Sequence, residues 1–442
     1  MAKKQKKELP PEERLAAARV PEEEWPYELP EDWAWVYIKA GFEVTSSKRV
    51  HKEDWLSDGI PFYRTRELVK LSDDGYVENE LFISEQLYNE FKESYGVPQE
   101  GDILISGVGT IGVPYIVDSS QKFYFKDGNV IWFKNLGLFL PKYIFYLYKS
   151  QFMYNQLHAM SSGTTVDTYT IVNAKKTKVP FPPLEIQQQI VTNIERLFAK
   201  LDQAKEKAQQ TLATAEPRKA AILHQAFTGQ LTEKWRAENG VAIESWETLT
   251  LNDCGEWNGG GTPSMQHDEY WENGNIPWIT SKDMKSNLIE DTLMHVNMVG
   301  VENSSAKLIE KPSLLFVTRS GILRRMLPIA MVKKAFTVNQ DLKVLTPSEE
   351  INLDYLFWAC RAKEREILAT CMKSGTTVES INFSALKQVE IPIPSLEEQK
   401  HIALVLDFLL EDEGNFRKKV IEVIDSCDAT KKAILAKAFR GE

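Results

Sequence analysis

The sequence predicts an α+β fold in which two globular mixed α/β segments are separated by two long antiparallel coiled-coil helices, as an internal repeat with pseudo-two-fold symmetry. The stretch Pro180-Phe-Pro-Pro-Leu-Glu-Ile-Gln-Gln-Gln-Ile190 recurs as Pro392-Ile-Pro-Ser-Leu-Glu-Glu-Gln-Lys-His-Ile402, a displacement of 402 − 190 = 212 residues. The same displacement relates Ser162-Gly-Thr-Thr-Val166 to Ser374-Gly-Thr-Thr-Val378 (374 − 162 = 212). A constant displacement over so long a stretch indicates that each copy is one structural unit.

The repeat divides the chain into alternating globular and helical parts. Residues 1–29 are rich in Lys, Glu and Pro, and we expect a short helix around Glu12–Arg19 in an otherwise loosely held segment. The predicted parts are the N-terminal segment (1–29), the first globular segment (30–183), the first helical region (184–229), a linker (230–243), the second globular segment (244–395) and the second helical region (396–442).

Inside the globular segments, short apolar strands and turns recur in the same order. The matched regions are 33–38 with 246–251, 60–66 with 276–282, 102–112 with 313–321, and 129–133 with 341–345. Aromatic-rich helices are predicted at Pro141–His158 and Leu353–Met372, each shortly before a Ser-Gly-Thr-Thr loop. Core residues match between the copies while loop residues differ, which suggests one scaffold that carries two different recognition surfaces.

The helical regions carry a heptad pattern, in which apolar or small side chains alternate at spacings of four and three residues. The residues expected to pair the helices are Ile190, Ile194, Leu197, Leu201, Ile402, Leu406, Leu409, Phe416 and Val420. Two amphipathic helices packed on separate globular cores would show a similar pattern. The shared register of the two copies favours pairing of the helices with each other.

Two residues depart from this pattern. Glu413 interrupts the second seam, and Pro217 should bend or break the first helix, because proline removes a hydrogen bond and crowds the preceding turn. Two-fold antiparallel pairing would set Leu201 near Phe416. A straight helix over Glu185–Glu216 has 216 − 185 + 1 = 32 residues and would span about 48 Å at ~1.5 Å per residue.

The overall composition limits the classes of function. A net charge of −10 is not the basic balance typical of nucleic-acid binding, but local patches are sufficient for phosphate contacts. The four cysteines lack metal-ligand spacing and are explained most simply as free thiols in a reducing cytoplasm. We find neither a signal peptide nor an apolar run long enough to span a membrane.

Catalytic and metal-binding motifs are missing from the sequence. The stretch Gly107–Gly112 has the glycine spacing of a dinucleotide site, but Val113-Pro114 does not begin a helix and the second copy lacks the glycines. A turn beside a binding surface is the favoured interpretation. The sequence has no G-x-x-x-x-G-K-[ST] loop and no amino-methyltransferase motif, and its six histidines are scattered. We therefore predict no catalytic residue and no metal ligand in this chain.

Polar clusters in the turns remain as candidate DNA contacts. Taken singly, each is more often only a solvated loop, but the clusters fall at corresponding places in the two copies. Arg and Lys suit guanine edges and phosphates, Asn and Gln suit adenine, and Ser and Thr suit phosphates. The candidates are Arg64, Arg66, Thr110, Lys126, Asn129, Thr164 and Thr165 in the first half, and Lys282, Arg319, Arg324, Arg325, Asn339, Gln340, Thr376 and Thr377 in the second.

Together these features resemble the specificity subunit of type I restriction-modification systems. The resemblance rests on the repeated Pro-x-Pro-x-Leu-Glu-x-Gln-x-x-Ile stretch, the long helix after it, and the Ala-Phe-x-Gly sequence at 226–229 and 438–441. It covers the chain from Pro30 to Glu442. It implies that the globular segments are target-recognition domains, each reading one half of a split site in double-stranded DNA, and that the chain itself is not catalytic.

The resemblance also implies the partners of the chain. Two methyltransferase subunits would dock on the central helices, and translocase-nuclease subunits would join for cleavage. S-adenosylmethionine, ATP and Mg would belong to those partners, and this chain would hold no cofactor. The helices would set the spacer within a footprint of roughly 14 base pairs, at ~3.4 Å per base pair. The N-terminal segment would complete a circular arrangement with the linker, although Leu9–Arg14 matches Leu231–Arg236 only weakly.

Two other classes of function stay open at this point. A self-contained DNA methyltransferase or nuclease with unrecognised motifs would bind S-adenosylmethionine as an isolated chain. A coiled-coil scaffold with no nucleic-acid role would fail to bind any duplex, alone or with a methyltransferase partner.

Overall fold

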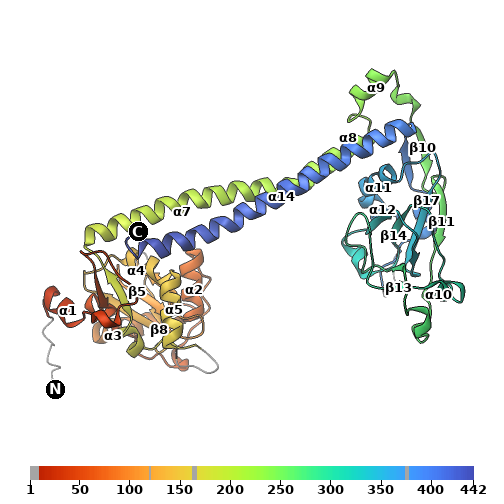
Figure 1. Cartoon of the computed structure of the whole chain (residues 1–442). Coiled ribbons are helices and arrows are strands. Elements are labelled where there is room, and N and C mark those ends of the chain that lie inside the picture. The colour runs from red at the N-terminus through yellow and green to blue at the C-terminus, as the bar shows by residue number, and fades with distance from the viewer. Residues whose placement is uncertain (1–8, 119–120, 162–166, 374–377) are drawn as a thin grey trace. The chain divides into compact units, whose positions relative to one another are not determined.

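The computed structural model describes residues 9–118, 121–161, 167–373 and 378–442 (Figure 1). The chain forms two compact units: unit 1 consists of Met1–Gln209 and Glu422–Glu442, and unit 2 of Gln210–Ile421. Each unit holds one of the predicted globular segments and part of both helical regions. The boundaries of the predicted functional domains stay a prediction.

Unit 1 contains the first globular segment. Its helices are α1 (Pro11–Ala17), α2 (Thr65–Asp74), α3 (Glu85–Tyr95), α4 (Pro141–Tyr148), α5 (Gln151–Met160), α6 (Ile171–Lys175) and most of α7 (Leu184–Ala213). Its strands are β1 (Ala34–Tyr37), β2 (Phe42–Thr45), β3 (Ile60–Tyr63), β4 (Phe82–Ile83), β5 (Ile103–Ser106), β6 (Pro114–Ile116), β7 (Tyr124–Phe125), β8 (Val130–Asn135) and β9 (Lys178–Phe181).

Unit 2 contains the second globular segment. Its helices are α8 (Ala215–Phe227), α9 (Glu233–Asn239), α10 (Met298–Glu302), α11 (Leu353–Ala362), α12 (Glu364–Cys371), α13 (Phe383–Lys387) and the first part of α14 (Leu396–Ala438), which ends in unit 1. Its strands are β10 (Glu247–Thr250), β11 (Gly255–Gly259), β12 (Ile276–Ile279), β13 (His295–Val296), β14 (Ser313–Val317), β15 (Ile329–Val332), β16 (Thr337–Val338), β17 (Leu342–Pro347) and β18 (Glu390–Ile393).

The sheets of the two units have the same topology, which confirms the internal repeat. In unit 1 the strand orders are β1-β9, β2-β8-β5-β6 and β4-β3-β7; in unit 2 they are β10-β18, β11-β17-β14-β15 and β13-β12-β16. The pairing of β3 with β7 is parallel, as is the pairing of β12 with β16. Every strand region predicted from the sequence as one copy of a pair therefore has its counterpart in the same place of the other unit.

The central strand of each unit is buried on both faces. In β5, Ile103 and Ile105 belong to the apolar cluster that includes α4 and α5, while Leu104 between them belongs to a second cluster on the other face. In β14, Leu314 and Leu315 are divided between two clusters in the same way. Because alternate side chains of a strand point to opposite faces, a strand covered on both sides needs an unbroken apolar run.

In unit 1, α7 and the C-terminal part of α14 lie side by side and run antiparallel (Figure 1). The Lys205 ammonium donates to both carboxylate oxygens of Asp428 at 2.8 and 2.7 Å. The Lys431 ammonium donates to Asp202 at 2.5 Å. A later residue of one helix thus pairs with an earlier residue of the other, as antiparallel packing requires.

In unit 2, α8 and the N-terminal part of α14 are also antiparallel. Arg218 pairs with Glu413 at 2.8 Å, and Arg417 pairs with Glu216 at 3.0 Å. The glutamate expected to interrupt the seam is therefore neutralised by an arginine of the facing helix.

The register of this pairing differs from the predicted one. The ring of Phe416 lies under the guanidinium of Arg218, 5.4 Å from it, whereas Asp202, next to Leu201, pairs with Lys431. The predicted contact between Leu201 and Phe416 is wrong. A heptad pattern identifies the face that pairs, but it does not fix how far two antiparallel helices are shifted along each other.

The predicted seam residues differ in burial. Ile194, Ile402, Leu406 and Val420 are buried, Ile190, Leu197, Leu201 and Leu409 are partly buried, and Phe416 is exposed. Ile194 shares a cluster with Leu435 of α14 and with α4 of the globular core, and Ile402 shares one with Leu223 of α8 and with α11. Pairing between helices and packing on a globular core, considered as alternatives above, thus occur on the same helix face.

Pro217 has the expected effect on the first helix. α7 ends at Ala213 and α8 begins at Ala215, with Thr214 between them. The proline ring crowds the carbonyl four residues before it, which belongs to Ala213, and proline has no N–H to donate to it. The break therefore falls where the hydrogen bond is lost.

Each predicted aromatic-rich helix is in fact two consecutive helices. α4 and α5 meet at Ser150, whose hydroxyl accepts a hydrogen bond from the Met153 N–H at 3.2 Å and so caps the second helix. α11 and α12 meet at Lys363. The apolar pattern continues across both junctions, so the sequence pattern alone does not reveal them.

The described part of the N-terminal segment is packed rather than loosely held. The expected short helix is α1, and Ala18 and Val20 after it are buried. The Tyr27 hydroxyl donates to the carbonyl of Phe439 at 2.9 Å, near the end of α14. The expectation of a loose segment is wrong because these apolar side chains complete the core of unit 1.

The N-terminal segment has in unit 1 the place that the linker has in unit 2. Gly229, after α8, and Gly441, after α14, have φ of 78° and 77°. A Cβ on Gly229 would lie 2.4 Å from Ile243 of the linker, and one on Gly441 would lie 2.4 Å from Pro30. These neighbours are themselves one repeat apart (243 − 30 = 213), which agrees with the circular arrangement that the resemblance implies.

Candidate nucleic-acid interface

In unit 1, loops distant in sequence are joined by backbone hydrogen bonds. The Lys126 N–H donates to the carbonyl of Tyr63 at the end of β3, and the Gly107 N–H donates to the carbonyl of Asn129, both at 2.8 Å. The Tyr169 N–H donates to the carbonyl of Gly107, also at 2.8 Å. We call residues 64–66, 107–110, 126–129 and 167–169 loop cluster 1.

Unit 2 repeats this arrangement bond for bond. The Asn339 N–H donates to the carbonyl of Ile279 at 3.0 Å, and the Thr318 N–H donates to that of Asp341 at 2.8 Å. The Ile381 N–H donates to the carbonyl of Thr318 at 2.8 Å. We call residues 280–282, 318–320, 339–341 and 379–381 loop cluster 2. The predicted correspondence between the polar clusters of the two copies is confirmed for these segments.

The glycines of loop cluster 1 serve close packing and a turn. A Cβ on Gly107 would lie 3.0 Å from the carbonyl oxygen of Tyr169 and 3.2 Å from that of Asn129. Gly109 has a φ of +80°, which favours glycine. The next element is the strand β6, so the helix that a dinucleotide site requires does not follow.

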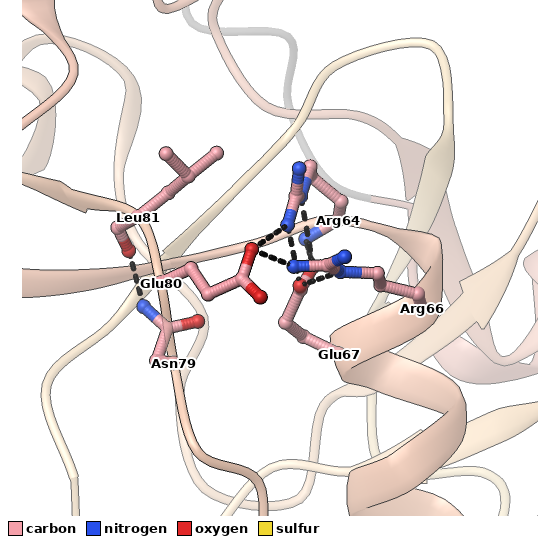
Figure 2. A network of polar contacts seen from close by, with 6 residues as sticks. All are labelled: Arg64, Arg66, Glu67, Asn79, Glu80 and Leu81. Carbon is pink, nitrogen blue, oxygen red and sulfur yellow. Dashed lines mark hydrogen bonds and ion pairs between the residues drawn. The ribbon is translucent and has the colours of Figure 1, made fainter.

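Arg64 and Arg66 come together at the start of α2 around one buried carboxylate (Figure 2). Glu67, only 2% exposed, accepts from the Arg64 backbone N–H at 2.9 Å and from the Arg64 side chain at 2.7 and 3.1 Å. Arg66 Nε donates to the same carboxylate at 2.5 Å. Glu80 pairs with Arg66 and lies 3.6 Å from Arg64. The two predicted base-reading arginines therefore form one cluster.

Glu67 is ionised in this cluster despite its burial. Burial alone would raise its pKa, but the hydrogen bonds from Arg64 and Arg66 outweigh that effect and lower the pKa to about 2. A buried, charged carboxylate with several donors is held rigidly, because any displacement would leave an uncompensated charge. Glu67 thus fixes the position of both guanidinium groups.

Asp283 takes the place of Glu67 in unit 2. Its carboxylate accepts from the backbone N–H and from the hydroxyl of Thr280, each at 2.8 Å. Lys282, the counterpart of Arg66, is exposed, and no ion pair of its side chain is found among the described residues. The same backbone frame therefore presents paired arginines in unit 1 and a hydroxyl with a single lysine in unit 2.

The three arginines predicted in unit 2 are in different surroundings. Arg319 is exposed in loop cluster 2, next to a backbone bridge to Ser380. Arg324 reaches the cluster through an ion pair with Glu379, whose pKa it lowers by hydrogen bonding. Arg325 instead lines a cleft bounded by α8, α11 and α12, so the structure does not bring it together with the others.

The remaining candidates divide by side-chain environment. Thr110 and Gln340 are exposed and Lys126 and Asn129 are partly buried in their clusters. Asn339 is buried, and its amide is hydrogen-bonded to Asp341 on both its donor and acceptor sides, so its predicted role in base contact is replaced by a structural one. Thr164, Thr165, Thr376 and Thr377 lie outside the described residues.

The sequence analysis recognised the Leu-Glu-x-Gln motif but missed what its glutamine does. Gln187 accepts from the Leu140 N–H at 2.9 Å and donates to the carbonyls of Leu138 and Pro182 at 3.2 and 3.0 Å. Gln399 makes the corresponding bonds in unit 2, to residues 350, 352 and 394. Each glutamine ties the start of a long helix to its globular segment. Its recurrence at the repeat distance was the available signal.

The described residues also set limits on other chemistry. Among them, no group of His, Cys, Asp or Glu side chains is arranged to hold a metal ion. The four cysteines are free and buried. Of the helices described, none combines the length and apolar character needed to cross a membrane.

Comparison with known proteins gives one family. The model described as "Type I restriction modification DNA specificity domain" matches residues 30–212 and 243–425. The specificity subunit of the EcoR124I/EcoR124II type I restriction enzyme of Escherichia coli is 40% identical over 161 residues, which is 36% of this chain and 40% of that protein. The MjaIX specificity subunit of Methanocaldococcus jannaschii is 31% identical over 197 residues, 44% of each chain. The aligned part thus spans less than half the length of these two curated relatives.

The fold is also that of a solved structure. The HsdS subunit from Thermoanaerobacter tengcongensis superposes with a TM-score of 0.67 at 19% identity, covering 95% of this chain and 99% of that one. At this identity the likeness concerns the fold.

Proposed function

Since this chain belongs to the type I restriction-modification DNA specificity family, we propose that its two loop clusters read the two halves of an asymmetric, split site in double-stranded DNA. The chain is the non-catalytic specificity subunit of such a system. Each globular segment would be one target-recognition domain.

The observation that carries the proposal is the pair of equivalent loop clusters. Matching backbone hydrogen bonds hold both clusters, so the frame is common to the units. The side chains differ: Arg64 and Arg66 in one unit stand where Thr280 and Lys282 stand in the other. Because different side chains select different base edges, one frame with two sets of side chains supports two different half-site sequences.

We further propose that the paired helices dock two methyltransferase subunits and that translocase-nuclease subunits join that complex. An exposed apolar pair on α14 supports a docking role, since Leu404 and Phe408, one turn apart in unit 2, are 68% and 71% exposed. Such side chains on a helix surface are typical of protein interfaces. S-adenosylmethionine, ATP and Mg would be bound by the partner subunits, in the cytoplasm where the DNA is.

Mapping of methylated adenines in host DNA tests the proposal. Cells with the chain should show methylation at a two-part site that is lost when the chain is deleted. Substitution R66A should relax the sequence of one half-site, and K282A should relax the other. A methylation map that does not change on deletion of the chain would refute the proposed function, and relaxation of both half-sites by R66A would refute the assignment of one cluster to each half.

A further inference from the structure

The arginines of loop cluster 1 carry a second carboxylate that differs from the first in its surroundings. Glu67 is 2% exposed, whereas Glu80 is 65% exposed and is held by the ion pairs to Arg66 and Arg64 (Figure 2). With both carboxylates in place, two positive and two negative charges cancel. The cluster proposed to meet the polyanion DNA is therefore neutral in this state.

We propose that Glu80 occupies the place that an oxygen acceptor of DNA takes on Arg64 and Arg66, so that it masks the arginine pair until DNA displaces it, while Glu67 remains as the positioning residue. This inference rests on the proposed function. The acceptor is a phosphate oxygen or the O6/N7 edge of guanine, both of which suit the guanidinium fork.

The chemistry of the guanidinium group supports this exchange. Arg binds carboxylates and phosphates in the same forked geometry and binds guanine with the same donors. An exposed carboxylate such as Glu80 loses little on returning to water, because a solvated ion pair contributes little. Glu67 lacks that freedom, since it is buried and also accepts from the Arg64 backbone. Departure of Glu80 alone leaves the cluster with one net positive charge.

Unit 2 provides the natural comparison. β4 and β13 correspond through a displacement of 213 residues (296 − 83), which sets Leu293 at the place of Glu80. The Leu293 N–H lies 3.4 Å from a carboxylate oxygen of Asp283, the counterpart of Glu67, so residue 293 borders the equivalent cluster. Leu293 is 80% exposed and carries no charge. The mask is therefore a property of the first cluster and not of the shared frame.

The first test uses the isolated chain and sulfate as the probe. E80Q removes the mask, and E78Q removes the same charge two residues earlier in the same loop. Sulfate, compared with chloride at equal ionic strength, should raise the melting temperature of E80Q more than that of wild type or E78Q. Equal sulfate effects on all three proteins would overturn the masking role, whether or not the chain reads DNA.

The second test uses the chain assembled with its methyltransferase subunits and a duplex that carries the mapped target. E80Q should bind about two- to fivefold more tightly than wild type, the scale expected for removal of one exposed ion pair, and E78Q should bind like wild type. A gain confined to duplexes with one particular G·C pair identifies guanine as the acceptor, and an equal gain on all duplexes identifies phosphate. E80Q binding no more tightly than E78Q would overturn the inference. If wild type shows no sequence preference, the proposed function fails instead, and the sulfate result still decides on Glu80.

Two reciprocal variants complete the design. L293E should place a mask beside Lys282 and weaken binding through the second half-site by a similar factor. E67Q should relax the base preference of the first half-site while the second keeps its preference, and E67D, which retains the carboxylate, should recover part of it. A preference profile unchanged in E67Q would show that Glu67 only supports the fold.

Discussion

Arg218 of α8 donates to both carboxylate oxygens of Glu413 of α14, with its Nη2 at 2.8 Å and its Nε at 3.2 and 3.3 Å. The glutamate stands at a heptad position where an apolar side chain would be expected. The arginine also covers the ring of Phe416. A polar position in the seam is thus matched by one specific partner, and such positions can fix the register of paired helices.

Loss of this partner should open the helix pair locally. We expect E413A to reduce the opening free energy of α8 amides by about 1–3 kcal/mol, since Arg218 then loses its charged acceptor while partly buried. Native-state hydrogen exchange of residues 215–227 measures this value. R417A, which removes the more exposed pair with Glu216, should cost less than about 1 kcal/mol. Equal effects of the two variants would contradict a special role for Arg218–Glu413.

The buried glutamines should matter more than their exposed neighbours. Q187A leaves the Leu140 N–H and two carbonyls without their partner in the interior, and we expect a loss of about 2–3 kcal/mol in the stability of unit 1. Q188A is the matched control, because the Gln188 amide is exposed and donates only to Thr192. Thermal unfolding compares the two variants, and a similar melting temperature for both would count against the anchoring role.

The stabilisation by Glu67 should depend on pH in a defined direction. Its pKa is about 2 in the folded chain, below the ordinary value of 4.5, so its contribution is complete above pH 4.5 and is lost as the pH falls towards 2. The difference in stability between wild type and E67Q should therefore be constant from pH 7 to about 5 and then shrink. Unfolding by denaturant at a series of pH values measures it. A difference that stays constant down to pH 3 would mean that Glu67 is not ionised in the fold.

The length of the paired helices should set the spacer of the DNA site. The ion pairs Lys205–Asp428 and Asp202–Lys431 share one register, which places the junction after Ala208 opposite that after Ile424. One heptad inserted at both points keeps the pairing and lengthens both helices by about 10 Å, or up to ~3 base pairs of spacer.

The control for this design is the same insertion after Ala208 alone, which shifts the register against α14 and should reduce methylation. Methylation mapping of the double insertion should show a longer spacer between unchanged half-sites. Retained methylation with the original spacer would show that the helices do not determine it.

The sequence predicted the features that depend on the repeat or on a single strong local cause. The matched strands followed from the displacement of 212 residues, and the helix break followed from Pro217. The features that failed depend on long-range pairing. Whether Glu80 would reach Arg66 across fourteen residues is decided by the path of the loop before β4, and the register of the helices is decided by partners such as Arg218 and Glu413. Arg325 follows Arg324 directly, yet the turn directs it to another face.

The frame of the loop clusters has a consequence for how this protein tolerates change. Its decisive bonds join backbone groups, such as the N–H of Gly107 and the carbonyl of Asn129, and backbone groups survive most substitutions. Side chains at 64, 66, 280 or 282 can therefore be exchanged without dismantling the loops that present them. Stability and target choice are drawn from separate parts of the same residues, so mutational drift can supply new specificities while the fold is left intact.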